Sequence, residues 1–257
     1  MLLHGFPELW YTWRRQLPAL AQAGHRAVAV DLRGYNLSSR PPGTGSYGTK
    51  IVAGDVARLI EALGRAQADV VGHDWGAGVA WALAMEHAAR VRRLAVLNGP
   101  HPVRLLAALR RPSQLVKSWY LLFFQLPWLP EVIVRRDRFL LLREGFASPP
   151  AQPGAYTEED IERYVAAWEA DGAVRAMLAY YRAMRRRSGA PRIRRIDTPV
   201  LAIWGDDDPH LERDLAEPPA KLVPDVRVVH LASASHWVHA DQPARVNELL
   251  IEHFLRD

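Results

Sequence analysis

The sequence predicts an α/β fold, in which a mostly parallel sheet is covered by helices and carries a helical insertion between two strands. Short apolar, β-branched runs alternate with longer segments of helical periodicity, as in strands joined by crossover helices. Several runs end at glycine or polar turn residues, and in such sheets active residues collect at the carboxyl ends of the strands. From about residue 103 to 196 the pattern becomes helical throughout and rich in arginine and aromatic residues.

The individual elements follow from these patterns. Apolar residues recur at helical spacing over 52–63 and again over 246–254. We expect strands at 27–30, 70–71, 94–97, 200–204 and 226–231. The expected organisation is a core domain of residues 1–102 and 197–257, with residues 103–196 inserted as a helical lid over the strand ends. A substrate pocket is expected between the two.

Composition narrows the functional classes. The 257 residues, 49% of them hydrophobic, suit one globular domain with an insertion. The absence of cysteine excludes disulfides and thiolate chemistry. The net charge of +5 comes mainly from scattered arginines rather than a focused patch, so no nucleic-acid partner is expected. The longest apolar run, 119–130, is too short to span a bilayer, and the first residues do not read as a signal peptide. We therefore expect a cytoplasmic protein with no membrane partner.

The most informative stretch is Gly72-His73-Asp74-Trp75-Gly76. The pattern G-x-S-x-G places a nucleophilic serine on a sharp turn between a strand and a helix, and here Asp74 occupies the place of the serine. Taken alone, Asp74 could simply cap the following helix. Asp208 and His236 also follow predicted strands, in the order nucleophile, acid, histidine. Taken alone, each of these two could equally be an ordinary loop residue, so the argument rests on all three together.

These residues lie in segments through which the sequence resembles the epoxide hydrolases of the α/β-hydrolase fold. The matching segments are HGFPE (4–8), DLRGYNLSSRP (31–41), GHDWGAGVAW (72–81), NGPHP (98–102), SWYLLFFQLP (118–127), YYRAM (180–184), WGDDD (204–208) and SHWVHADQP (235–243). They are spread over almost the whole chain. HGFP and GHDWG together are typical of an aspartate nucleophile, and the lid segments favour epoxide hydrolases. The resemblance implies addition of water to an epoxide, giving a vicinal diol through a covalent aspartyl ester, with no metal or organic cofactor.

The resemblance also assigns roles to the strand-end residues. Asp74 is the nucleophile, His236 the base that activates water, and Asp208 the acid that orients the histidine. Asp208 is favoured over its two neighbouring aspartates because the family places this acid three positions after the glycine. Some relatives carry the acid after the preceding strand, but that strand ends here at Asn98, which cannot ionise. A carboxylate suits the chemistry, because attack on a saturated carbon gives an ester that water can hydrolyse, whereas serine would give a stable ether.

Further residues are expected to stabilise charge and to bind substrate. The resemblance implies that the backbone N–H groups of Phe6 and Trp75 form the oxyanion hole. It implies that Tyr120 and Tyr181 donate protons to the alkoxide formed on ring opening, whereas Tyr180 is expected to pack in the lid. The residues expected to contact substrate are His4, Trp119, Phe123, Phe124 and Trp237. The expected partners are a small apolar or aromatic epoxide and water, and a homodimer is left open.

Three alternatives use the same fold. A haloalkane dehalogenase has the same aspartate, histidine and acid, but a halide leaving group requires N–H donors, so paired lid tyrosines favour an epoxide. A fluoroacetate-type dehalogenase usually has arginine where this chain has Trp75. A non-catalytic ligand-binding member of the fold often lacks one of the three catalytic residues, whereas all three are present here.

The start of the chain departs from the family pattern. Relatives have a longer segment before HGFPE, which forms the first strands of the sheet, whereas three residues precede His4 here. We therefore expect these N-terminal strands to be missing and the strand at 27–30 to lie at an exposed edge.

Overall fold

The structure is a computed structural model, and it describes residues 1–147 and 152–255. Four residues of the expected lid, 148–151, therefore lie outside the described part. The strands are β1 (Leu2–Leu3), β2 (Ala29–Val30), β3 (Ala68–His73), β4 (Val91–Leu97), β5 (Val200–Gly205) and β6 (Val226–Leu231). The α-helices are α1 (Gln16–Gln22), α2 (Thr49–Ala62), α3 (Trp75–Glu86), α4 (Pro102–Ala108), α5 (Pro112–Lys117), α6 (Trp119–Phe123), α7 (Leu129–Ala147), α8 (Glu158–Glu169), α9 (Ala173–Ala183), α10 (Val238–Asp241) and α11 (Pro243–Leu255).

The strands of the described residues form one sheet in the order β2-β1-β3-β4-β5-β6, and every neighbouring pair is parallel. This is the α/β architecture that the alternating pattern predicts. β2 lies at an edge, as expected, and pairs with β1 along two residues only. It is therefore shorter than the run at 27–30, whereas β3 is longer than the run at 70–71 because neighbours on both sides extend its pairing.

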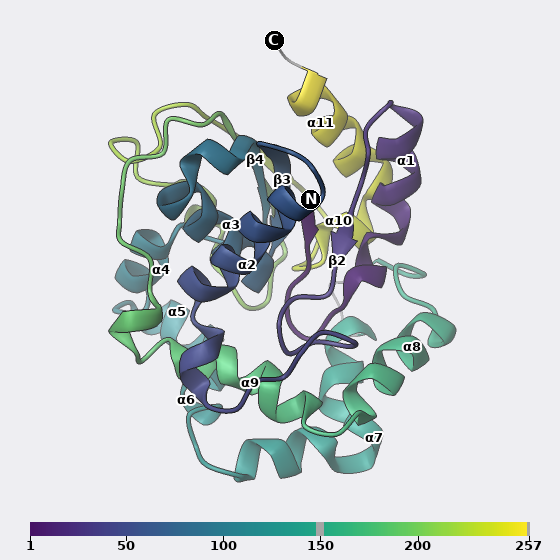
Figure 1. Cartoon of the computed structure of the whole chain (residues 1–257). Coiled ribbons are helices and arrows are strands. Elements are labelled where there is room, and N and C mark those ends of the chain that lie inside the picture. The colour runs from purple at the N-terminus through teal and green to yellow at the C-terminus, as the bar shows by residue number, and fades with distance from the viewer. Residues whose placement is uncertain (148–151, 256–257) are drawn as a thin grey trace.

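Side chains of the central strands alternate between two cores, as the period of a strand requires. In β4, Leu94 and Val96 face the core that contains α2 and α3, while Ala95 and Leu97 face the core that contains α1 and α11. Figure 1 shows these two pairs of helices on opposite faces of the sheet. Both faces of β4 are thus buried, which explains why its sequence is a continuous apolar run.

Helices α4 to α9 lie between β4 and β5 in the chain; in Figure 1, α6 to α9 gather below the sheet, while α4 and α5 lie to the left. Their inner residues, such as Phe146, Tyr164 and Trp168, join the same core as α2 and α3. Within α7 the backbone leaves the helical region over residues 136–139, so this element is two helical pieces joined by a sharp break. The inserted helices are therefore packed on the core at the end where β4 terminates.

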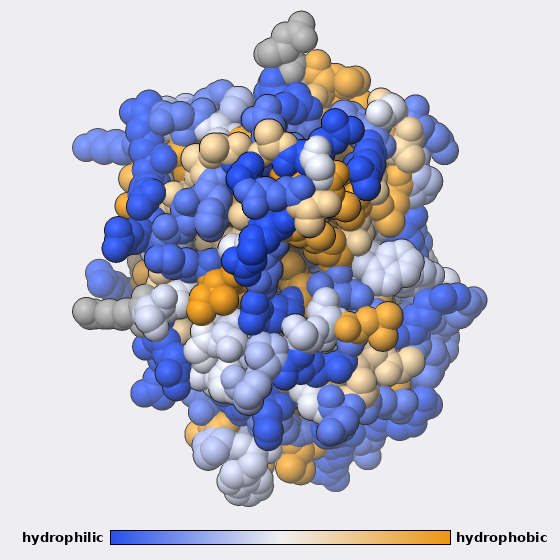
Figure 2. All heavy atoms as spheres, in the orientation of Figure 1, coloured by the Kyte–Doolittle hydropathy of each residue, from blue (hydrophilic) through white to orange (hydrophobic). Residues whose placement is uncertain are grey.

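The surface is mixed in character. Figure 2 shows hydrophilic spheres over most of the visible face, with orange apolar groups between them. Among the residues that the structure describes, no helix is both long enough and apolar enough to cross a membrane.

The turn after β3 depends on very close packing of α3 against β1. A Cβ added to Gly76 would lie 2.1 Å from the backbone oxygen of Leu3. A Cβ on Gly78, one half-turn later, would make only ordinary contacts, the nearest at 3.6 Å from the side chain of Thr49. The two glycines therefore form a matched pair for testing this packing.

We predict that Gly76→Ala lowers the free energy of unfolding by about 3 kcal/mol, because the backbone must shift to admit the methyl group. The control Gly78→Ala is expected to raise it by about 0.5 kcal/mol through helix propensity. Urea unfolding of both variants measures the difference. Equal effects of the two substitutions would show that close packing at Gly76 is not the constraint.

Candidate active site

Asp74 lies at the turn between β3 and α3 with φ 49° and ψ −116°. A non-glycine residue with positive φ is uncommon, and such strain persists only where the surroundings enforce it. Here the small residues Gly72 and Gly76 allow the turn to be this sharp, since a side chain on either would meet backbone atoms. The Asp74 carboxylate is therefore presented from the tip of β3 rather than along the helix that follows.

The two carboxylate oxygens of Asp74 have different partners. Oδ1 accepts a hydrogen bond from the backbone N–H of Phe6 at 2.8 Å. Oδ2 lies 3.6 Å from Nε2 of His236. Burial raises the pKa of Asp74, but His236 and the Phe6 N–H outweigh it and hold this pKa below its usual value. Asp74 is thus an anion at neutral pH without help from a base.

His236 connects Asp74, which is half-buried, to the fully buried carboxylate of Asp208. Its Nδ1 lies 2.7 Å from Oδ2 of Asp208, on the opposite side of the ring from Asp74. Burial opposes the charge on the imidazole, but the two carboxylates together raise the pKa of His236 to about 10. Burial likewise acts against the charge of Asp208, but His236 is the main reason that the pKa of Asp208 falls to about 2.

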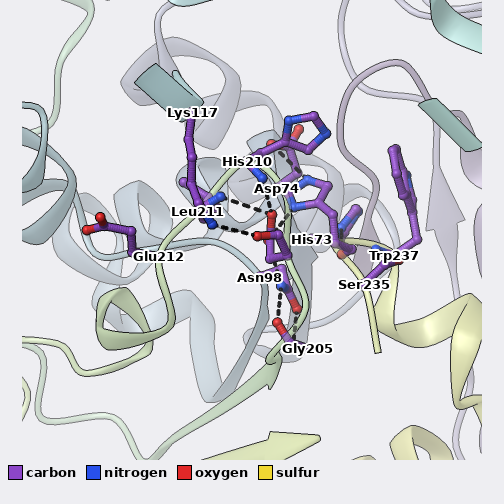
Figure 3. A network of polar contacts seen from close by, with 12 residues as sticks. His73, Asp74, Asn98, Lys117, Gly205, His210, Leu211, Glu212, Ser235 and Trp237 are labelled. Carbon is purple, nitrogen blue, oxygen red and sulfur yellow. Dashed lines mark hydrogen bonds and ion pairs between the residues drawn. The ribbon is translucent and has the colours of Figure 1, made fainter. Parts of the chain in front are cut away.

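Asp208 is fixed from several directions, by groups of Asn98, His210 and Leu211 that Figure 3 labels. Its Oδ1 accepts the backbone N–H groups of His210 at 2.7 Å and Leu211 at 3.0 Å. Its Oδ2 also accepts the side-chain amide of Asn98 at 2.7 Å, and Asn98 in turn accepts the backbone N–H of Gly205 at 2.9 Å. Asn98 does not replace the acid but orients it, a role that the sequence argument missed.

Two tyrosines from the inserted helices face this group. Tyr120 on α6 and Tyr181 on α9 line the same cavities as Asp74, and their rings lie 6.0 Å apart in an edge-on arrangement. Within residues 1–147 and 152–255, neither hydroxyl has a protein acceptor. Burial, aided by the negative charge of Asp74, raises the pKa of both phenols well above the usual value. Both are therefore neutral hydroxyls that can donate.

The cavity above Asp74 has two arms. One, of about 150 Å³, contains Asp74, His236 and several apolar side chains; its lining is Phe6, Pro7, Asp74, Trp119, Tyr120, Phe124, Leu141, Leu142, Gly145, Tyr181, His210, His236 and Trp237. The other, of about 210 Å³, shares Asp74 and both tyrosines with the first and adds Trp75. A substrate centred on Asp74 would have apolar walls on both sides.

Two residues expected to contact substrate are not in either arm. His4 is fully buried; its Nε2 accepts the backbone N–H of Leu32 and its Nδ1 lies 2.9 Å from the backbone oxygen of Gly5, so it supports the loop. Phe123 packs against Trp119 and is absent from both linings. His210 and the apolar residues of α7, which no sequence motif singles out, line the smaller arm.

The expected oxyanion donors are near the nucleophile. The N–H of Phe6 already binds Asp74, as described above. Trp75 is the first residue of α3, so its N–H has no acceptor one turn earlier in the helix. Both donors thus come from the backbone around the Asp74 carboxylate, and the positive end of the helix dipole adds to the second.

A second buried network holds the loop that carries Phe6. Oε2 of Glu8 accepts the backbone N–H of Gly5 at 3.1 Å and lies 2.8 Å from Nδ1 of His73. Nε2 of His73 lies 2.9 Å from the backbone oxygen of His236. Burial would raise the pKa of Glu8, but His73 and His239 hold it well below its usual value. This carboxylate therefore joins the loop, the residue before Asp74 and the backbone of His236.

Glu8, His73 and His239 are residue types that can bind a metal ion. Each offers one ligand atom, and these atoms lie within 4.8 Å of one another. All three are fully buried, and Thr12 bridges Glu8 and His239 with contacts of 2.5 and 2.6 Å. Because these atoms already satisfy one another, the cluster is better described as a hydrogen-bonded support than as a metal centre.

Comparison with known proteins agrees with this geometry. The sequence matches the family described as the alpha/beta hydrolase fold over residues 1–243. It is 39% identical over 254 residues to the AB hydrolase superfamily protein YfhM of Bacillus subtilis, covering 98% of this chain and 88% of that protein. It is 37% identical over 257 residues to Epoxide hydrolase 4 of Homo sapiens, covering 97% and 70%.

Solved structures give the same result. A crystal structure of a methionine-to-alanine mutant of an epoxide hydrolase from Bacillus megaterium matches with a TM-score of 0.90 and 34% identity, covering 99% of this chain and 92% of that one. A phenylalanine-to-alanine mutant of that enzyme, complexed with its product (R)-3-[1]naphthyloxy-propane-1,2-diol, matches equally well. The protein is thus a hydrolase of α/β architecture. The chain belongs to the α/β-hydrolase fold family, within its epoxide hydrolase branch.

The raised pKa of His236 predicts how this residue affects stability. With a folded pKa of about 10 and an unfolded value of about 6.5, the stabilisation from His236 is complete below pH 6.5 and is lost as the pH rises through 10. We predict that the free energy of unfolding is higher for the wild type than for His236→Gln. This difference should be largest at acidic pH and should shrink toward pH 10. Urea titrations of both proteins across this range measure it. A pH-independent difference would contradict the ion pairing.

Proposed function

We propose that the protein is an epoxide hydrolase that converts an epoxide and water into a vicinal diol through an ester on Asp74. One observation carries this proposal. A half-buried, ionised carboxylate shares one largely apolar cavity with His236, which is paired to Asp208 behind it, and with two neutral tyrosine hydroxyls. That set supplies a nucleophile, a base and proton donors, the three functions that ring opening and ester hydrolysis need.

The first step is ring opening. Oδ2 of Asp74 attacks an epoxide carbon, the carbon–oxygen bond breaks, and Tyr120 or Tyr181 gives a proton to the departing oxygen. Oδ1, already bonded to the N–H of Phe6, becomes the carbonyl oxygen of the ester. The reacting centre is therefore an ester carbonyl, which water can attack.

The second step is hydrolysis of the ester. Esterification removes the negative charge of Asp74, which is one cause of the high pKa of His236. The imidazolium therefore releases its proton, which passes through solvent to the ionised tyrosine, and the neutral imidazole then accepts a proton from water. Asp208 stabilises the imidazolium so formed, and the N–H groups of Phe6 and Trp75 stabilise the oxyanion. The diol leaves with a proton from His236, and the acid proton of Asp74 passes to His236, which restores the starting ion pair.

The cavity favours an apolar or aromatic epoxide. Trp119, Phe124 and Trp237 line the smaller arm, beside Asp74. The naphthyl-bearing product bound by the Bacillus megaterium enzyme supports a substrate of this kind. We further propose that residues 103–196 act as a lid on the core of residues 1–102 and 197–257, because they supply both tyrosines.

Trapping the ester tests the proposal. We expect His236→Gln incubated with styrene oxide to gain the whole mass of the epoxide, since ring opening proceeds without the base that drives hydrolysis. Intact-mass spectrometry with peptide mapping should place the adduct on Asp74, and Asp74→Asn should gain nothing. An adduct formed only from a haloalkane, with halide released, would favour the dehalogenase alternative. A folded protein that forms no adduct from either would favour a ligand-binding role.

The tyrosines have a separate test. We predict that Tyr120→Phe and Tyr181→Phe each slow ring opening by roughly 10²-fold, the usual contribution of a positioned acid. Tyr180→Phe is the matched control, because the Tyr180 hydroxyl donates to the backbone oxygen of Arg33 at 2.7 Å. Single-turnover kinetics of adduct formation measure these rates. If all three variants open the ring alike, the tyrosines are not the proton donors.

A further inference from the structure

The inserted helices carry a stripe of exposed apolar side chains on their outer face. Leu115 on α5, Trp119 and Leu122 on α6, and Leu126 in the turn after α6 are all exposed. With their exposed neighbours they form what we call the apolar stripe, which consists of Leu115, Val116, Trp119, Leu122, Leu126, Trp128, Val132 and Ile133. Soluble monomers rarely expose contiguous apolar patches without a function.

Trp128 adds backbone strain to this exposure. Its φ is 50°, in the left-handed region that a bulky side chain normally avoids. Its side chain is 68% exposed, so burial of the indole does not offset the free-energy cost of this backbone conformation. A strained backbone that presents a tryptophan to solvent is a feature expected at a binding surface.

The stripe reaches the mouth of the catalytic cavity. Trp119 belongs to the stripe and also lines the smaller arm, as does Leu141 on α7, which lies outside the stripe. Both are well exposed, at 56% and 39%. An apolar compound bound at Trp119 would therefore already touch a side chain that lines the cavity.

Near the stripe, Arg111 and Arg136 are paired with the acids Glu212, Asp214 and Asp137, but other cations among the described residues are not paired. Exposed Arg110 and Arg135 flank it, and no acidic partner binds either side chain in the described part of the chain. Glu131, the one acid between them in the sequence, is paired with Arg182, with the closest contact at 2.6 Å. Arg182 also donates to the backbone oxygen of Leu126, which brings the end of α9 beside the stripe.

The end of α9 adds further cations. Arg185 and Arg186 follow it, and both side chains are exposed. A second copy of the chain placed face to face on the stripe would bring these like charges together, which is unfavourable. Figure 2 shows pale and orange spheres at the lower edge of the molecule, where α7 begins, bordered by hydrophilic ones.

We propose that the apolar stripe docks on a lipid surface with anionic head groups. Tryptophan and leucine side chains enter the interface while the arginines bind lipid phosphates, the arrangement of interfacial helices. The cavity mouth then faces the lipid, where apolar epoxides concentrate. This goes beyond the proposed function and differs from the expectation, drawn from the sequence, of no membrane partner.

Vesicle flotation tests the docking without any epoxide, so its outcome does not depend on the proposed reaction. We expect the wild type to float with vesicles of phosphatidylcholine and phosphatidylglycerol. The floating fraction should be smaller with phosphatidylcholine alone, and it should fall as added salt screens the charges. Leu122→Ser/Trp128→Ser should lower partitioning about tenfold, because two apolar anchors are lost. Arg110→Gln/Arg135→Gln should lower it on anionic vesicles only.

The matched control is Leu255→Ser, since Leu255 is 60% exposed at the end of α11, far from the stripe in Figure 1. It should float like wild type. Circular dichroism and turnover of a water-soluble epoxide should be unchanged in all variants, because none of these residues lines the cavity. Absence of flotation, or flotation equal in all variants, would overturn the proposal. If the wild type is a dimer in solution and Leu122→Ser/Trp128→Ser is a monomer, the stripe binds a second copy of the chain. That result would overturn the proposal of lipid docking.

Discussion

The strained turn at Asp74 is the constraint on which the site depends. A positive φ at this residue places the carboxylate beyond the end of β3, and only the absence of side chains at Gly72 and Gly76 lets α3 start so close to β1. The same closeness brings the Phe6 loop to the carboxylate, where its N–H binds Oδ1. Position and electrostatic environment of the proposed nucleophile thus come from one backbone geometry.

Two buried carboxylates, Asp208 and Glu8, support this turn from different sides. Asp208 holds the ring of His236, and Glu8 holds the Phe6 loop and His73, whose other nitrogen contacts the backbone of His236. Each carboxylate is buried with a histidine beside it, so the cost of burying its charge is offset by pairing. Asp208 therefore positions the imidazole ring of His236, and His73 positions its backbone.

Sequence reasoning works best where one backbone rule applies to many proteins. Strand ends of a parallel sheet meet along one edge, so the motifs around Asp74, Asp208 and His236 were enough to place these residues together. The lid tyrosines came from the family resemblance. Side-chain direction is harder to predict: His4 lies in the matching loop but points inward to Leu32, and Phe123 directly precedes the cavity-lining Phe124 without lining the cavity itself.

The roles of Asn98 and Glu8 depend on contacts across more than sixty residues of chain, for which no local pattern exists. Strand lengths show the same effect. The run at 70–71 predicts a short strand, yet β3 extends over Ala68–His73 because β1 and β4 pair with it. Tertiary pairing thus outweighs the modest strand propensity of its alanine, aspartate and glycine.

The origin of the oxygen in the product tests the covalent mechanism most directly. With enzyme in excess over epoxide in ¹⁸O-water, attack by Asp74 puts an unlabelled carboxylate oxygen into the first diol formed, and the label enters Asp74 when water hydrolyses the ester. Mass spectrometry of the diol and of the peptide containing Asp74 follows both atoms. The account predicts an unlabelled diol and a labelled Asp74 after one turnover. A labelled diol and an unlabelled Asp74 would mean that water attacks the epoxide directly, and would contradict it.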